Sequence, residues 1–415
     1  MVTITCLGGG KEVGRASIKV SAKEEKFLLD YGIEVQDMKV PLDPGKDITS
    51  VFLSHAHLDH SGYIPNLYKK GYNGKVYATP VTFGLAGLLL RDSIKVQGKK
   101  GLQPQFLLDH VKKMERLKAA INTGKDIRFK KSTVKLFNAG HVPGSCSTLI
   151  EADGKKVLYT GDIKFTSTSL TKGAFDNYRN IDVLVTESTY SYRNHPNRKE
   201  LLDSLRELAQ KTVYKNGILL LPAFAVGRTQ ELLTVLYDLG FKTYMDGMGI
   251  EATRVMLSHP KSIRDPKRLA KAFGAAHKIK NFRQRTDVVK NPCVIITTAG
   301  MLNGGPISYY IKKLHKRSDC ALVMSGYQVD GTVGRRLLDT GIYMNEGINV
   351  KPKMDVSFLD LSAHCGRDSL LKFIRKVKPK KVVLVHGDRT GEFALELKGM
   401  GFDAYAPSNG DSIEA

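Results

Sequence analysis

The sequence predicts an α/β protein in which a layered, sheet-rich domain is interrupted by an inserted domain of alternating helices and strands. Two observations predict this organisation. Short β-like runs fill the first third of the chain, separated by glycine and Asn-Gly turn signals that are typical of a sheet-rich domain. From about Asn197 the pattern changes to helices that alternate with apolar strands, and such alternation predicts a parallel sheet.

The expected elements follow from these patterns in chain order. Strands rich in β-branched and aromatic residues are expected at 3–7, 18–20, 26–30, 50–54, 75–78, 133–138, 148–152 and 157–160. The inserted part predicts helices at 199–215 and 229–239 and strands at 217–222, 242–245, 293–297 and 321–325. A β-run at 354–361, a helix at 367–377 and a strand at 381–386 follow. The resulting domains are 1–196, an insertion at 197–352, and a return of the first domain at 353–415.

Length and composition suit a soluble globular protein of two domains, since the chain has 415 residues, 42% of them hydrophobic and 25% charged. No apolar run approaches the roughly 20 residues of a membrane-spanning helix. The first residues, MVTITCLGGG, are expected to form a strand and a turn rather than a secretory signal. Five scattered cysteines without CxxC spacing argue against a disulfide framework and favour a reducing compartment. We therefore expect a cytoplasmic protein without membrane contact.

The net charge of +23, from 64 basic and 41 acidic residues, favours a polyanionic partner. A nucleic acid fits this charge, because each phosphate that a basic side chain neutralises releases condensed counterions.

Residues 51–60, VFLSHAHLDH, form the most informative segment. In an extended segment His55 and His57 point the same way, whereas Asp59 and His60 fall on the turn into the next helix and can face a second centre. Neutral imidazoles and carboxylates are ligands that suit Zn²⁺. This dense array predicts a metal site.

Three further residues follow buried strands at glycine-marked loops: His141 after 134–138, Asp162 after 157–160, and His386 after 382–385. A strand end is a rigid place from which to present a reactive side chain. Each of them alone would be an ordinary structural residue. Together with the segment at 51–60 they provide enough ligands for two ions.

Motifs spread over the whole chain, and in a fixed order, carry a family resemblance. They include LGGGKEVGR, FLLDYG, SHAHLDHSGYIP, AGHVPGS, YTGD, TESTY, LPAFAVGRTQELL, TTAGMLNGGP, SGYQVDGTVGRRLL and LSAHCGRDSL. On these motifs the chain resembles the metallo-β-lactamase superfamily and, within it, the β-CASP ribonucleases. It looks most like the endonuclease subunit of the cleavage and polyadenylation specificity factor and that subunit's archaeal relatives, in a form without KH domains. The resemblance implies a metallo-β-lactamase αββα sandwich with an inserted α/β β-CASP domain.

The resemblance also implies two Zn²⁺ ions per chain and assigns their ligands. One set is His55, His57, His141 and Asp162. The other is Asp59, His60, His386 and the shared Asp162. Asp30 matches a residue that orients the ligand loop from outside the metal set.

A proton-transfer pair outside the metal set is implied as well. His364 matches the histidine that protonates the leaving oxygen, and Glu187 matches its carboxylate partner. Asp59 is expected to serve catalysis as well as metal binding. In the inserted domain Arg228, Arg335 and Arg336 are candidate partners of RNA phosphates, although each could equally belong to a solvated helix face.

The implied activity is zinc-dependent hydrolysis of phosphodiester bonds in single-stranded RNA, during RNA 3′-end processing or decay. Endonuclease and 5′–3′ exonuclease modes stay open. The alternatives are a DNA-processing β-CASP nuclease and a non-catalytic RNA-binding scaffold; histidine at 386 favours RNA over DNA, and the intact ligand set argues against the scaffold. A β-lactamase, lactonase or glyoxalase would have no use for a basic inserted domain. A homodimer, or association with related β-CASP subunits, is compatible with the sequence.

Overall fold

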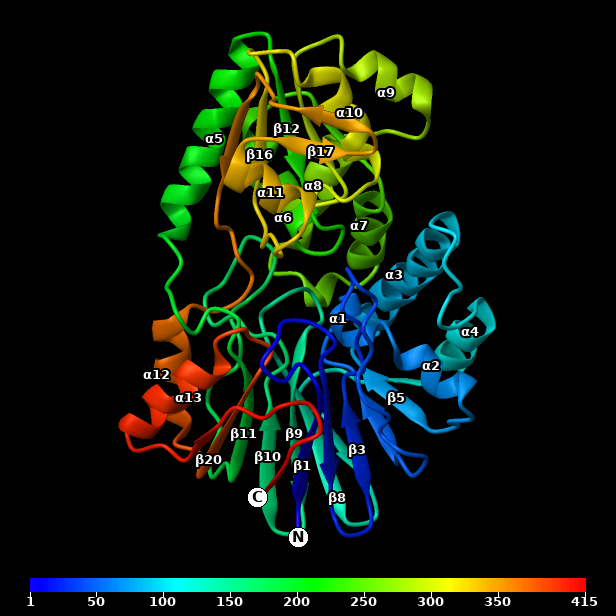
Figure 1. The fold of residues 1–415 in the computed structure, drawn as a ribbon, viewed down its shortest axis with the longest axis vertical. Coiled ribbons are helices and arrows are strands. Elements are labelled where there is room, and N and C mark those ends of the chain that lie inside the picture. Colours follow the sequence, from blue (N-terminus) through cyan, green and yellow to red (C-terminus); the bar gives the residue numbers. More distant parts are fainter. The chain divides into compact units, whose positions relative to one another are not determined.

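The computed structural model describes all residues from Met1 to Ala415, and the chain folds into two compact units (Figure 1). Unit 1 comprises Met1–Ser167, Thr171–Asn194 and Ala363–Ala415. Unit 2 comprises Thr168–Leu170 and His195–Ser362.

Two seven-stranded sheets form the centre of unit 1. The first sheet has the order β22-β1-β2-β3-β4-β5-β6, with strands Ser412–Glu414, Thr3–Gly8, Ser17–Ser21, Lys26–Leu29, Ser50–Phe52, Lys75–Ala78 and Lys118–Ala120. The second has the order β21-β20-β11-β10-β9-β8-β7, with strands Ala404–Tyr405, Lys381–Val385, Val183–Glu187, Lys155–Tyr159, Cys146–Ala152, Ser132–Asn138 and Asp126–Arg128. The N-terminal strand β1 pairs antiparallel with the C-terminal strand β22, so the two termini lie side by side (Figure 1).

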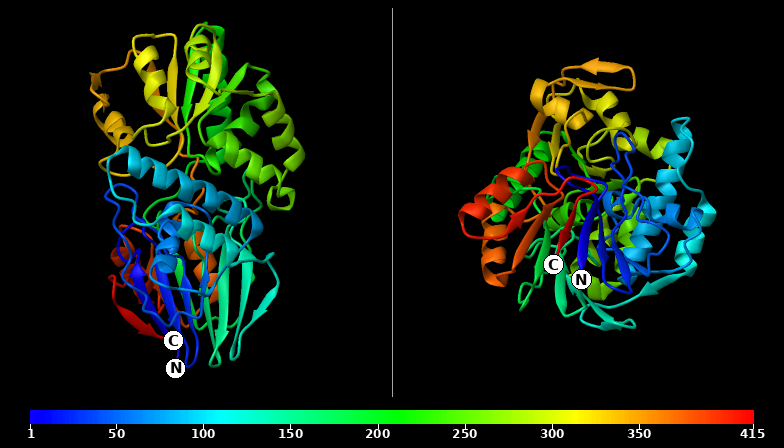
Figure 2. Two further views of the ribbon diagram at one scale, coloured as in Figure 1. Left: turned by 90° about the vertical axis from the view of Figure 1, so that its right-hand side faces the viewer. Right: turned by 60° about the horizontal axis from the view of Figure 1, so that its bottom comes forward.

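Helices cover the outer faces of both sheets, which gives unit 1 four layers (Figure 2). On the side of the first sheet lie α1 (Leu58–Ser61), α2 (Ile64–Lys69), α3 (Pro80–Lys99) and α4 (Leu108–Arg116). On the side of the second lie α12 (Arg367–Val377) and α13 (Thr390–Gly399). None of the helices is both long enough and apolar enough to cross a bilayer.

The central strands of the second sheet are buried on both faces because each face packs on a different core. On β10, Val157 and Tyr159 point into the core between the two sheets, whereas Leu158 points into the core under α12 and α13. Val383 and Leu384 on β20 divide in the same way. This explains why these strands read as continuous apolar runs rather than as alternating ones.

Unit 2 is built on a six-stranded parallel sheet of order β14-β13-β15-β12-β16-β19. Its strands are His277–Lys278, Thr243–Asp246, Cys293–Thr297, Ile218–Pro222, Ala321–Met324 and Asp355–Phe358. A small hairpin pairs β17 (Tyr343–Asn345) with β18 (Ile348–Val350).

Helices alternate with the strands of unit 2, as the sequence pattern predicts. They are α5 (Arg198–Tyr214), α6 (Arg228–Leu236), α7 (Gly249–Leu257), α8 (Pro266–Ala275), α9 (Phe282–Val288), α10 (Pro306–Leu314) and α11 (Val333–Thr340), with short 3₁₀ turns at Tyr237–Leu239 and Pro260–Ser262. Residues of α9, α10 and α11 pack with one face of the sheet in a single apolar cluster.

The return of the chain to unit 1 lies later than the sequence pattern suggests. The β-run expected to start the return at 353 forms β19, and β19 pairs in parallel with β16 of unit 2. The chain therefore stays in unit 2 up to Ser362 and rejoins unit 1 at Ala363. A short apolar strand carries no signal for the sheet that it joins, since pairing partners are set by tertiary packing.

Gly32 illustrates how closely two segments of unit 1 approach each other. The backbone of 31–33 bonds to the backbone of 58–60, with Tyr31 N donating to His60 O at 2.8 Å and Ile33 N to Leu58 O at 2.9 Å. A Cβ atom added at Gly32 would lie 1.7 Å from the carbonyl oxygen of Asp59. Only glycine fits here without moving the segment that carries Asp59 and His60.

We therefore expect Gly32→Ala to displace the segment at 58–60. The free energy of unfolding should fall by about 1–3 kcal/mol, as for other overpacking substitutions, and affinity for divalent metal should fall with it. Denaturant unfolding and metal titration measure the two effects. Gly98→Ala is the matched control, because a Cβ atom there meets nothing within 4 Å, and it should lower neither quantity; within helix α3 alanine is the better helix former. Normal metal affinity in Gly32→Ala would contradict the expectation.

Candidate metal centre

Histidine and aspartate side chains gather at one edge of the two sheets of unit 1. Strands β3 and β4 run parallel in the first sheet, and β10, β11 and β20 run parallel in the second. The loops that follow them present His55, Asp162 and His386. Because the carboxyl ends of these strands meet at one edge, residues more than 300 positions apart in the chain become neighbours.

The first group of potential ligands is His55, His57, His141 and Asp162. Nδ1 of His57 lies 3.1 Å from Nε2 of His55 and 3.2 Å from Nε2 of His141. Oδ2 of Asp162 lies 3.5 Å and 3.6 Å from the same two Nε2 atoms. Four donor atoms therefore surround one point.

The second group is Asp59, His60, Asp162 and His386. Oδ1 of Asp162 lies 3.2 Å from Nε2 of His60 and 3.6 Å from Nδ1 of His386. Oδ2 of Asp59 lies 3.3 Å from Nε2 of His386. Asp162 thus belongs to both groups, with one carboxylate oxygen facing each.

These separations fit ligands around a metal ion. Ligand atoms about 2.0–2.1 Å from a tetrahedral ion lie about 3.3 Å from one another, which is close to the separations given above. In the second group Oδ2 of Asp59 lies farther from Nε2 of His60, at 3.9 Å. Nε2 of His60 and Oδ1 of Asp162 are buried and have no hydrogen-bond partner, although they lie 3.2 Å apart. Buried polar atoms are costly when left unpaired, and a shared cation would satisfy both.

The carboxylate of Asp30 bonds to the ring of His60 at Nδ1, the nitrogen that faces away from Asp162. Asp30 is fully buried, and its Oδ2 accepts a hydrogen bond from Nδ1 of His60 at 2.7 Å and another from Oγ of Ser54 at 2.7 Å. Since Nδ1 of His60 carries the proton, Nε2 is left as the atom that can bind metal. Asp30 and His386 both have left-handed backbones, with φ of 58° and 50°; such strain is typical of functional positions.

The imidazoles of the centre differ in the direction in which their surroundings shift the pKa. Burial lowers the pKa of His55 and of His141 well below the usual range, so both rings are neutral, as metal ligands must be. Burial also acts on His60, but the carboxylates of Asp162 and Asp30 outweigh it and raise its pKa well above the usual range. In the metal-free chain these carboxylates therefore favour a protonated His60 ring, and a bound cation would take the place of the proton on Nε2.

His364 and Glu187 form a pair beside the two groups. Nδ1 of His364 lies 3.0 Å and 2.9 Å from the two carboxylate oxygens of Glu187, and its Nε2 lies 3.9 Å from Oδ2 of Asp162. Burial alone would lower the pKa of His364, but the carboxylates of Glu187 and Asp162 raise it to about 9. At neutral pH its ring therefore carries a proton on Nε2, facing the centre.

Three contacts within unit 1 hold the segment that carries His364. Nδ1 of His141 lies 3.0 Å from the carbonyl oxygen of Ala363. Nζ of the buried Lys164 donates to the carbonyl oxygen of His364 at 2.9 Å. The backbone N–H of Cys365 donates to Ile163 O at 2.8 Å. The position of His364 is therefore tied to a ligand residue and to the loop that follows Asp162.

The three candidate phosphate contacts, Arg228, Arg335 and Arg336, all lie in unit 2. Arg228 is buried and forms an ion pair with Glu231. Arg335 is exposed and pairs with Asp339 at 2.8 Å, and its neighbour Arg336 is half-buried.

Sequence reasoning missed Ser54, Lys164 and Tyr159 as members of the site. All three lie within or beside the quoted motifs. A serine, a lysine and a strand-end tyrosine carry no signal of a role on their own, since that role depends on what the folded chain places opposite them.

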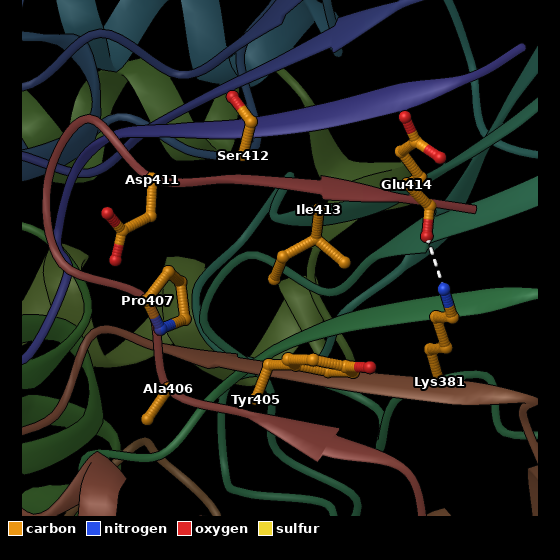
Figure 3. Close-up of a pocket in the computed structure, with 8 residues that line it drawn as sticks. All are labelled: Lys381, Tyr405, Ala406, Pro407, Asp411, Ser412, Ile413 and Glu414. Atoms are coloured by element: carbon orange, nitrogen blue, oxygen red, sulfur yellow. Dashed lines mark hydrogen bonds between the residues drawn. The ribbon is translucent and has the colours of Figure 1, made fainter.

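A cavity of about 450 Å³ lies elsewhere in unit 1, between β21 and β22 (Figure 3). Lys381, Tyr405 and Ile413 are among its lining residues. Lys381 begins β20, whereas His386 follows the other end of that strand. None of the candidate metal ligands lines the cavity.

Models of three domain families match successive parts of the chain. The metallo-beta-lactamase superfamily matches residues 17–213, the Beta-Casp domain 229–337, and the Zn-dependent metallo-hydrolase RNA specificity domain 348–407.

Full-length relatives agree with these matches. The chain is 35% identical to Probable RNase MJ4 of Methanocaldococcus jannaschii over 98% of both chains. It is 37% identical to RNase aCSPSF2 of Saccharolobus solfataricus, over 98% of this chain and 84% of that one. It is 33% identical to Transcription termination factor FttA of Methanosarcina mazei, over 93% and 67%. A solved structure from Enterococcus faecalis V583, of unknown function, shares the fold with a TM-score of 0.64 over 99% of both chains, at 15% identity.

The chain belongs to the metallo-β-lactamase superfamily, in the branch of metal-dependent hydrolases that carries a β-CASP domain. The predicted family and the predicted fold class, an αββα sandwich with an inserted α/β domain, are thereby confirmed. Together with the clustered His and Asp side chains, the family identifies a divalent metal site.

Metal removal should destabilise the protein. We expect added Zn²⁺ to raise the thermal unfolding midpoint of the EDTA-treated chain, since a ligand at 100 times its dissociation constant stabilises by about 2.7 kcal/mol. Asp162→Asn should abolish most of this shift, because Asp162 faces both ligand groups. Asp203→Asn, on the exposed face of α5, should keep it. Equal shifts in both variants, measured by calorimetry, would argue against a centre organised on Asp162.

Proposed function

We propose that the chain is a zinc-dependent ribonuclease that hydrolyses phosphodiester bonds of single-stranded RNA, in RNA 3′-end processing or decay. The observation that carries the proposal is the His364–Glu187 pair beside two ligand groups that share Asp162. The relatives named RNase support RNA as the substrate.

Two Zn²⁺ ions per chain are proposed. His55, His57, His141 and Asp162 would hold one ion, and Asp59, His60, His386 and Asp162 the other. The mixture of imidazole and carboxylate donors suits zinc. When bound, two such ions supply Lewis-acid polarisation of a phosphodiester and activation of water.

His364 is the proposed proton donor. Hydrolysis of a phosphodiester breaks a P–O bond, and the oxygen that leaves the phosphorus needs a proton. Nε2 of His364 carries one and faces the centre, while Glu187 holds the ring through Nδ1. Glu187 is itself fixed by the backbone N–H of Ile163, which donates to its Oε1 at 2.8 Å. The pair therefore keeps the proton on the required nitrogen.

The net charge of +23 supports a polyanionic substrate. Arg228, Arg335 and Arg336 stay candidates for phosphate contacts. We further propose a cytoplasmic location, which the five free, buried cysteines support, and either a homodimer or an assembly with related β-CASP subunits.

Cleavage of labelled substrates tests the proposal. Single-stranded RNA labelled at the 5′ or the 3′ end, and the matching DNA, should be incubated with the zinc-loaded chain and separated on one denaturing gel. We expect cleavage of RNA, with internal fragments for an endonuclease and mononucleotides from the 5′ end for an exonuclease. Preference for DNA would support the DNA-processing alternative. No cleavage of either, with zinc bound, would leave the scaffold alternative.

We expect His364→Ala to retain both zinc ions and to lose about 10²–10⁴-fold in kcat, the usual contribution of general-acid catalysis. Zinc content by mass spectrometry and single-turnover cleavage measure the two properties. His277→Ala is the control, because His277 is an exposed histidine of unit 2 outside every ligand group, and its rate should equal that of wild type. A His364→Ala rate near that of wild type would refute the assignment.

A further inference from the structure

The structure assigns Tyr159 as a positioning residue of the metal centre: its phenol holds the Asp30 carboxylate in the one orientation that aims both His60 and His55 at their ligand groups. This inference rests on the proposed function, because it takes the two ligand groups as a metal centre.

The phenol of Tyr159 is buried at the end of β10, three residues before Asp162. Its ring packs into the core between the two sheets, where phenylalanine would bury the same apolar surface. Packing alone therefore does not explain the hydroxyl group, since a buried hydroxyl is costly unless it is hydrogen-bonded. It donates to Oδ2 of Asp30 at 2.8 Å.

Asp30 collects donors from two separate parts of the chain, the ligand loop at 54–60 and strand β10. Oδ2 accepts from Tyr159, from Nδ1 of His60 and from Oγ of Ser54, while Oδ1 accepts from the backbone N–H of Ser54 at 2.7 Å. These donors fix the rotation of the carboxylate about its Cβ–Cγ bond. Tyr159 is the only one of these donors that comes from the second sheet.

The orientation of Asp30 reaches both ligand groups. Asp30 receives the proton of His60 directly, so that Nε2 of His60 faces Asp162. Oγ of Ser54 gives its own proton to Asp30 and so is left to accept from Nδ1 of His55, at 3.0 Å. This hydrogen bond leaves Nε2 of His55 unprotonated and facing the first group. A single carboxylate therefore sets the tautomers of one imidazole in each group.

Without the Tyr159 hydroxyl, the side chain of Asp30 is bonded only to the ligand loop at 54–60, through Ser54 and the ring of His60. The carboxylate then gains freedom to rotate, and both imidazoles lose part of their orientation. Partners of this kind, which contact a ligand rather than the metal, are typically worth about 10–100-fold in metal affinity or activity.

The test measures metal affinity rather than activity alone. Tyr159→Phe and wild type are stripped of metal and titrated with Zn²⁺ against a chromophoric chelator, and then with Co²⁺, whose visible absorption reports ligand geometry. We expect a zinc affinity about 10–100-fold weaker and an altered cobalt spectrum. In an Asp30→Ala background Tyr159→Phe should have no further effect on affinity.

Tyr310→Phe is the matched control. Tyr310 is a buried tyrosine of unit 2 whose hydroxyl donates to the buried carboxylate of Asp246, also at 2.8 Å. It loses the same kind of hydrogen bond as Tyr159→Phe but lies outside every ligand group, so its metal affinity should match that of wild type. Thermal unfolding of the metal-free proteins compares the stability that each variant loses, and the unfolding midpoint should fall by a similar amount in the two variants.

The other outcomes distinguish failure of the proposed function from failure of the role assigned to Tyr159. Wild type that binds no zinc would overturn the proposed function. If wild type binds zinc and Tyr159→Phe has the same affinity and cobalt spectrum, only the role of Tyr159 falls. Equal weakening in Tyr310→Phe, or a metal-free Tyr159→Phe that does not fold, would show that the hydroxyl serves the fold rather than the metal centre.

Discussion

The hydrogen bonds of the buried Asp30 carboxylate are the interaction on which the arrangement of the metal ligands depends. Asp30 sits where β3 ends, and it joins the ligand loop at 54–60 to strand β10 of the opposite sheet. A buried carboxylate is stable only with several donors, and these donors are the residues that shape the centre. The cost of burying one charge is thus coupled to the orientation of two imidazoles.

Asp162 connects the two ligand groups directly, since it belongs to both. Its two oxygens face different ligand groups, and both groups consist mainly of buried side chains. Although burial opposes ionisation, nearby imidazoles, those of His60 and His386 foremost, hold the pKa of Asp162 well below its usual range. Without a cation, the centre leaves Nε2 of His60 and Oδ1 of Asp162 unsatisfied. A metal ion removes this cost, and this links the stability of unit 1 to metal binding.

The covalent order of the chain adds a further link. The main part of unit 2, His195–Ser362, lies in the sequence between Glu187 and His364, yet these two residues form a hydrogen-bonded pair within unit 1. The segment after Ser362 is held by His141, Lys164 and Ile163 as soon as it re-enters unit 1. Because His141 is also a ligand candidate, metal binding and the placement of His364 share one side chain.

The sequence alone determined the family and the class of fold, and it predicted the donor residues that the structure brings together, because these depend on local features. Spacing within HAHLDH is read along a single loop, and strand-end positions follow from apolar runs. The two ligand groups could be assigned from the sequence only through the family resemblance. The tertiary structure supplies the physical reason for them, since Asp162 meets His60 and His386 only through strand pairing and the packing of two sheets. It also decided that β19 belongs to unit 2 and that the hydroxyl of Tyr159 reaches Asp30. Hydrogen bonds between residues 129 positions apart leave no trace in local pattern, because their geometry exists only after the core between the sheets has formed.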